Sequence, residues 1–205
     1  MNTGNRYIRK EYAPERLAAL LAAAPAGWPY GERMRRLCAA LAGAPYRRAP
    51  LGGGPGQPEA FTAALDAFDC VTFCETVMAL ARSADAAEFL DRLRLIRYSG
   101  GRVTWEARRH YLSRWLADNA AEGRLALLRH PAGKAPRVWT RCLAVVPGLP
   151  PATAAVCGWP KRALATFRHV VRDGDVAGFI STRRGLDYFH VGVLLVEAGG
   201  PVLVH

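Results

Sequence analysis

The hydrophobic pattern of this chain changes once along its length, and that change limits the folds it can adopt. Up to about residue 120, apolar residues recur every three or four positions, as in "CVTFCETVMALA" at residues 70–81, a pattern typical of amphipathic helices. From residue 174 onward they form the short runs "GDVAGFIST", "LDYFHVGVLLVE" and "PVLVH", separated by glycine-containing turns. This order predicts an α+β fold, with N-terminal helices packed on a C-terminal antiparallel β-sheet.

The same patterns place the individual elements. The Gly- and Pro-rich stretch at residues 43–59 is predicted to be a loop, and residues 123–163 to follow the surface with short strands. Helices are expected over residues 13–42 (in two pieces), 69–82, 85–98 and 105–120, the last with Trp105 facing inward.

Length and apolar content favour one domain. With 205 residues, 51% of them hydrophobic, the chain can bury a full core. We expect a single domain over residues 1–205, made of a helical extension (1–42) and a core (43–205). The last predicted strand runs to His205, which suggests a core truncated at its C-terminus.

No apolar run is long enough to span a membrane. The apolar stretch at residues 17–27 could belong to a signal peptide, but Glu11 and Glu15 precede it, so we expect a leaderless, cytoplasmic protein, with the cell envelope as the alternative.

Five scattered cysteines show no zinc-binding spacing, so we expect reduced thiols, no metal and no other cofactor. The net charge of +11 comes almost entirely from arginine. It indicates either an anionic partner or a compositional bias. The arginines form no long basic run and no obvious groove-reading helix. We expect neither a nucleic acid nor a membrane as partner. The oligomeric state stays open.

Two of the cysteines, Cys70 and Cys74, lie one helical turn apart. Asp69 is a good helix N-cap, which puts Cys70 in the first turn, where the helix dipole lowers a thiol pKa. Cys74 falls on the apolar stripe and is expected to be inert. Position alone leaves open whether Cys70 is a nucleophile or a packed core residue.

A nucleophilic cysteine needs a base. His190 stands inside an apolar strand, as a base or as a core histidine bonded to backbone. A turn at Gly199-Gly200 would pair His205 with Leu194 and leave the two histidines roughly 13 Å apart along the strand. Spacing alone therefore does not make His205 an orienting partner. His130 and His169 are expected in loops or at the surface, without a role.

Several motifs together resemble one known family. "FDCVTF", "DYFHVG" and "VLVH" follow the Cys, His, third-polar-residue order of the NlpC/p60 superfamily of papain-like cysteine amidases. "GAPYRRAPLGGG" is similar to its Gly-x-Pro-Tyr segment. "IRYSGGRVTWEARRHYLSRW" resembles the branch of N-acetylmuramoyl-L-alanine amidase-like proteins. The likeness covers residues from about 40 to 205 and implies a papain-like fold.

The resemblance also implies residue roles. Cys70 would be the nucleophile, His190 the general base, His205 the residue that orients the imidazole, and Tyr46 a hydroxyl near the oxyanion. The expected substrate-binding residues are Asp69, Arg108, His110, Tyr111 and Asp187. Arg109 departs from the branch pattern, which has a small polar residue there.

The implied activity is hydrolysis of a cell-wall-derived amide by a cysteine amidase, at the N-acetylmuramoyl-L-alanine bond of a small muropeptide. Two alternatives stay open: acyl transfer to an amine by the same Cys-His site, and a non-catalytic module that binds anionic polymers.

Overall fold

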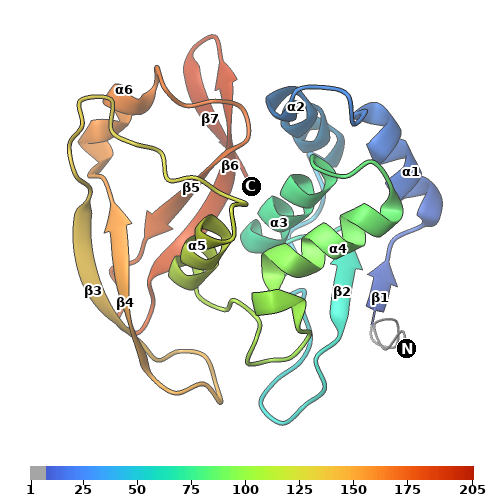
Figure 1. Cartoon of the computed structure of the whole chain (residues 1–205), viewed down its shortest axis with the longest axis horizontal. Coiled ribbons are helices and arrows are strands. Elements are labelled where there is room, and N and C mark those ends of the chain that lie inside the picture. Colours follow the sequence, from blue (N-terminus) through green and yellow to red (C-terminus); the bar gives the residue numbers. More distant parts are fainter. Residues whose placement is uncertain (1–7) are drawn as a thin grey trace.

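The computed structural model describes residues 8–205, and the part of the predicted N-terminal extension before residue 8 lies outside it. Figure 1 shows helices α1–α4 on one side of the molecule and strands β3–β7 on the other, with α5 between them. The helical segments are α1 (Pro14–Ala23), α2 (Tyr30–Leu41), α3 (Cys70–Leu80), α4 (Ala86–Arg97), η1 (Ser99–Gly101), α5 (Leu112–Ala121), η2 (Lys161–Ala163) and α6 (Leu164–Phe167).

Within residues 8–205 the strands form three small sheets. They are β1 (Ile8–Glu11), β2 (Phe61–Ala64), β3 (Arg137–Leu143), β4 (Ala152–Gly158), β5 (Asp175–Ile180), β6 (Tyr188–Glu197) and β7 (Gly200–Val204). β5, β6 and β7 form an antiparallel sheet with β6 in the middle, β3 and β4 form a hairpin, and β1 pairs in parallel with β2. The expected order of helices followed by antiparallel strands is present. The β1–β2 pair was not predicted, because two four-residue strands so far apart in sequence carry no local signal.

Helix α3 lies at the centre of the core. Its residues from Thr72 to Leu80 are all buried, and its apolar side chains share one cluster with Val191 and Val193 of β6. Continuous burial explains why this helix is apolar on nearly every face. The sheet therefore packs on the helix that begins at Cys70.

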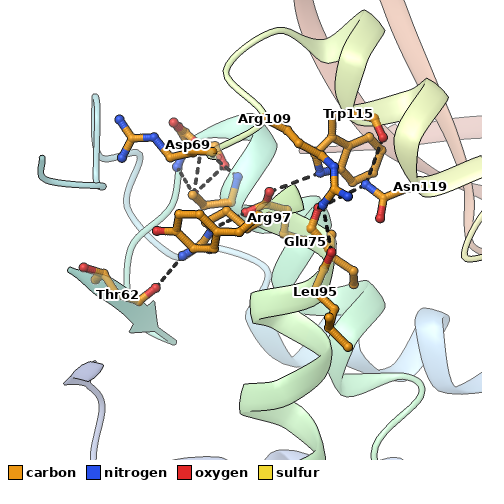
Figure 2. A network of polar contacts seen from close by, with 12 residues as sticks. Thr62, Asp69, Glu75, Leu95, Arg97, Arg109, Trp115 and Asn119 are labelled. Carbon is orange, nitrogen blue, oxygen red and sulfur yellow. Dashed lines mark hydrogen bonds and ion pairs between the residues drawn. The ribbon is translucent and has the colours of Figure 1, made fainter. Parts of the chain in front are cut away.

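Buried polar contacts fix the orientation of α3 (Figure 2). Glu75 accepts hydrogen bonds from Arg97 Nε at 2.7 Å and from Trp115 Nε1 at 3.1 Å. Arg97 also donates to the Thr62 carbonyl. Both members of the Glu75–Arg97 pair are almost fully buried, where loss of one partner leaves an unpaired charge in a low-dielectric environment. These bonds tie α3 to α4, α5 and β2.

The expected helix over residues 105–120 is wrong in its first half, since α5 begins only at Leu112. The preceding residues follow an irregular path that their side chains stabilise. Arg109 turns inward and donates to the carbonyls of Leu95 and Ile96 at the end of α4, at 2.8 and 3.1 Å. Trp105 lies outside the helix, half-buried beside His110.

Candidate active site

The start of α3 is built by Asp69. The Asp69 carboxylate accepts from the backbone N–H of Thr72 at 2.8 Å, and the Thr72 hydroxyl oxygen accepts from the Asp69 N–H at 3.0 Å. This reciprocal capping box satisfies two amides at the helix end and confirms the predicted N-cap. It makes Cys70 the first residue of the helix.

The Cys70 side chain is half-buried, and its sulfur lies beside β6. The backbone amide of Val191 lies close enough to the Cys70 sulfur to lower its pKa, as do the amides of Cys70 and Val71. Since Val191 directly follows His190, the thiol lies beside the peptide bond that joins these two residues. β7 makes its last pair with β6 at Val193 and Val204, so the Val191 amide lies beyond the β6–β7 ladder and is available to the sulfur.

The expected low thiol pKa is wrong. Burial raises the pKa of Cys70 above its ordinary value of 9.0, and the nearby Asp69 charge adds to this, although the three backbone amides act in the opposite direction. Cys74 lies in the core, as expected, and its burial raises the pKa of this thiol well above the ordinary value. At Cys70, desolvation therefore outweighs the backbone amides that favour the thiolate.

The two histidines are brought together by the register of the β6–β7 hairpin. Glu197 pairs with Gly200, so the turn is Ala198-Gly199, and Leu194 pairs with Leu203. The expected pairing of Leu194 with His205 is wrong by two residues. The true register places His205 next to His190, with ring centroids 4.4 Å apart and ring planes nearly perpendicular at 88°.

Close approach of the two strands at this point depends on Gly192. A Cβ atom there would lie 2.7 Å from the Leu203 side chain and 2.8 Å from the Val204 carbonyl oxygen. Only glycine fits, which allows the end of β7 to carry His205 against β6.

The environment of His190 complements that of Cys70. Burial, and then the charge of His205, lower the pKa of His190 below its ordinary 6.5. With the Cys70 pKa raised and the His190 pKa lowered, the thiol is protonated and the imidazole neutral near pH 7. A neutral thiol and a neutral imidazole would suit proton removal during attack better than a preformed thiolate–imidazolium ion pair.

Tyr46 lies at the same end of α3. Its backbone pairs with Phe68, the residue just before Asp69, and Tyr46 is 69% exposed. Partial burial raises the pKa of the Tyr46 phenol, and the charges of Cys70 and Asp69 add to the increase. The phenol therefore lies close enough to Cys70 and Asp69 for their charges to raise its pKa.

Two aromatic neighbours of His190 were not predicted. Phe179 lies opposite His190 in β5 with ring centroids 6.0 Å apart, and Phe189 packs beside Phe179 at 6.1 Å. A β-bulge shifts the register here and leaves Phe189 65% exposed. The alternation of "DYFHVGV" in a strand could have suggested an outward-facing aromatic residue beside the histidine.

Arg108 and His110 belong to a neighbouring group around Trp105. Arg108 donates to the buried carboxylate of Glu59 at 2.8 Å and stacks over the Trp105 ring, 4.5 Å from its centroid. A ring nitrogen of His110 hydrogen-bonds to the Trp105 carbonyl at 2.7 Å, and burial lowers the pKa of His110. No sequence pattern indicated that Glu59 would contact Arg108.

Tyr111 and Asp187 hold the start of α5 in place. The Tyr111 hydroxyl oxygen accepts from the Val145 amide at 2.9 Å. Asp187 is buried and accepts from the amides of Ser113 at 2.6 Å and Tyr188 at 2.8 Å. Both side chains thus join α5 to neighbouring segments, and their predicted contact with substrate stays a prediction.

The structure therefore brings together Asp69, Cys70 and Tyr46 at the start of α3, and His190 with His205 on the adjoining sheet. A broad open hollow of about 630 Å³ lies elsewhere, between the start of α2 and residues 171–175. None of the predicted catalytic residues lines it. Within residues 8–205 no group of three or more His, Cys, Asp or Glu side chains is placed to hold a metal ion.

Comparison with known proteins agrees with this arrangement at the level of fold. A crystal structure of an N-acetylmuramoyl-L-alanine amidase from Bacteroides uniformis is similar, with a TM-score of 0.70, 21% identity, and coverage of 86% of this chain and 84% of that one. A protein from Legionella pneumophila gives a TM-score of 0.70 at 18% identity, with coverage of 93% and 85%.

At the level of sequence, no curated protein matches the chain. The family model described as N-acetylmuramoyl-L-alanine amidase-like does match, over residues 36–205. This match spans most of the chain, including the start of α3 and the whole β5–β7 sheet. The chain accordingly belongs to the N-acetylmuramoyl-L-alanine amidase-like family.

Proposed function

We propose that this protein is a cysteine amidase that hydrolyses the amide bond between an N-acetylmuramoyl group and L-alanine in small muropeptides. One observation supports the proposal most strongly. The Cys70 sulfur, at the start of a helix, lies beside the amide that follows His190, and the His190 ring is packed against His205. This Cys-His-His order also supports kinship with the papain-like NlpC/p60 superfamily.

The reaction begins with a neutral pair. His190 accepts the thiol proton as the Cys70 sulfur attacks the amide carbonyl carbon. The amides of Cys70 and Val71 at the helix start, with the Tyr46 hydroxyl, donate hydrogen bonds to the oxyanion of the tetrahedral intermediate. His205 keeps the imidazole in position by packing against its ring.

The intermediate collapses by breaking the C–N bond. His190 returns the proton to the leaving amine of the alanyl group, which departs and leaves a thioester on Cys70. His190 then takes a proton from water as the water oxygen attacks the thioester carbon. Collapse of this second intermediate releases the muramoyl carboxylic acid and gives the sulfur its proton back.

The direct test compares two matched variants, Cys70→Ala and Cys74→Ala, in an assay that measures L-alanyl amine released from an N-acetylmuramoyl dipeptide. We expect Cys70→Ala to lower kcat/KM about 10³-fold or more, and His190→Ala to lower it about 10²- to 10⁴-fold. Cys74→Ala should keep activity, since that thiol is buried and protonated.

Retention of activity by Cys70→Ala would refute the cysteine mechanism. If a competing amine instead captured the muramoyl group in preference to water, the protein would be an acyltransferase rather than a hydrolase.

A further inference from the structure

The positive charge of the chain is concentrated in one segment. Residues 123–172 contain no Asp or Glu, so nine of the net +11 charges come from this segment. Its basic residues are Arg124, Arg129, Lys134, Arg137, Arg141, Lys161, Arg162, Arg168 and Arg172. Because these basic residues are spaced apart, the segment contains no long basic run that would mark it in the sequence.

The fold gathers most of these residues around α6. The His130 ring, which lies in a loop as expected but is buried, packs on Trp159 at 4.8 Å and on Phe167 at 5.3 Å. These contacts hold the loop before β3 against the segment that contains η2 and α6, and Figure 1 shows this loop passing beside α6. Arg137, the first residue of β3, pairs with Gly158 at the same end of the hairpin.

The exposed cations on these neighbouring segments, called the basic patch below, are free of carboxylate partners among the described residues. Within residues 8–205, none of its six cations lies within 4.0 Å of an Asp or Glu oxygen, in contrast to the paired Arg35, Arg97 and Arg109. The six exposed cations are Arg129, Lys134, Arg137, Lys161, Arg162 and Arg168. Their charge is available to an anion outside the chain.

Exposed aliphatic side chains are mixed with these cations. Leu127 is 75% exposed and lies two residues before Arg129, and Leu164 is 64% exposed and lies two residues after Arg162. Val138, next to Arg137, is 60% exposed. Aliphatic side chains gain nothing from a phosphate or sugar chain in water, but they gain from burial in an apolar layer.

We propose that the basic patch docks the protein on the surface of an anionic lipid bilayer. Lys and Arg side chains would contact the lipid headgroups, while Leu127 and Leu164 enter the boundary with the acyl chains. No helix among residues 8–205 is long and apolar enough to cross a membrane, and docking of this kind requires none. This departs from the expectation of no membrane partner, and it does not depend on the proposed reaction.

The test is co-sedimentation of the whole protein with vesicles made of phosphatidylglycerol and phosphatidylcholine, compared with phosphatidylcholine alone, at about 0.1 M salt. We expect binding to the anionic vesicles only. Lys161→Glu with Arg162→Glu should weaken it at least about tenfold, since each basic residue near an anionic surface contributes about fivefold. Leu127→Ala with Leu164→Ala should also weaken it at least about tenfold.

The matched control is Lys10→Glu with Arg102→Glu, which changes the net charge equally at exposed positions outside the segment. It should bind vesicles as the unaltered protein does, and thermal unfolding would verify that every variant is folded. An equal loss of binding in this control, or no binding to anionic vesicles, would overturn the proposal. So would tighter binding to a soluble polyanion, such as polyphosphate or DNA, that the Leu variants leave unchanged.

Discussion

At the scale of single residues, the candidate site depends on groups that are neutral near pH 7. Burial raises the pKa of Cys70 and lowers that of His190, so both shifts favour the neutral forms from which the proposed reaction starts. A neutral pair avoids the cost of keeping a buried ion pair desolvated. The activity of the protein should therefore depend mainly on the protonation state of His190.

The pH profile of kcat/KM tests this dependence. Because His190 must be neutral to accept a proton, activity should rise with pH through its lowered pKa, with a midpoint below 6.5. His205→Ala removes one of the two causes of that lowering, so the midpoint should move to higher pH. If His205→Ala reduced kcat but left the midpoint unchanged, His205 would have only a packing role.

A substitution at Asp187 tests whether this residue has a structural role or binds substrate. Asp187→Asn replaces an oxygen that accepts from Ser113 or Tyr188 with an NH₂ group that cannot accept. We expect a loss of about 1–3 kcal/mol in the free energy of unfolding, measured by urea denaturation, with Asp66→Asn at an exposed position as control. An increase in KM without loss of stability would instead support substrate binding.

Residue roles could be predicted only where local sequence decides them. Asp69 as N-cap and Cys70 as the first helical residue follow from a few neighbouring side chains, and the structure has both. The raised Cys70 pKa and the nearby Val191 amide could not be predicted, because they depend on how deeply α3 packs against a strand about 120 residues later.

At the scale of elements, the positions of most helices and strands followed from periodicity, while the register of β7 did not. Register depends on which residues form the turn. The adjacent glycines Gly199 and Gly200 suggested a turn one residue later than the actual turn at Ala198-Gly199. The same limit applies to residues 105–111, where ion pairs and hydrogen bonds of Arg108 and Arg109 override a sequence with helical spacing.

Gly192 offers a test of the β6–β7 geometry. Gly192→Ala places a methyl group within 2.8 Å of the Val204 backbone oxygen, so β7 must shift and carry His205 away from His190. We expect a clear loss of kcat with a smaller change in KM. Gly199→Ala, where nothing lies within 4 Å of the added Cβ, is the control and should keep full activity. Equal activity of both variants would contradict the role of this close approach.

At the scale of the whole molecule, Arg35 joins the helical side to the sheet. It donates two hydrogen bonds of 2.8 Å to Asp173, just before β5, and one of 2.6 Å to Glu197 at the end of β6. Burial acts to raise the pKa of Asp173, but hydrogen bonds from Arg35 and from the Val196 amide outweigh it and leave the pKa below 3.8.

A pH titration of stability tests this connection. A carboxylate with a lowered folded-state pKa stabilises the protein above its unfolded pKa and loses that effect as the pH falls through the folded value. Arg35→Met should therefore cost about 1 kcal/mol near neutral pH, a modest amount because the pair is partly exposed. The difference from wild type should shrink below about pH 4. A difference that stayed constant with pH would mean that Arg35 acts through packing.

The hairpin turn at Ala198-Gly199 has a consequence for how this chain can vary. Surface turns normally tolerate insertions, and this one is open to solvent. Yet the number of residues between this turn and each histidine determines whether His205 lies beside His190. One added residue would move every β7 side chain to the opposite face of the sheet. We therefore expect insertions and deletions in this turn to be tolerated as poorly as substitutions in the core, although the proposed reaction involves no contact between the turn and the substrate.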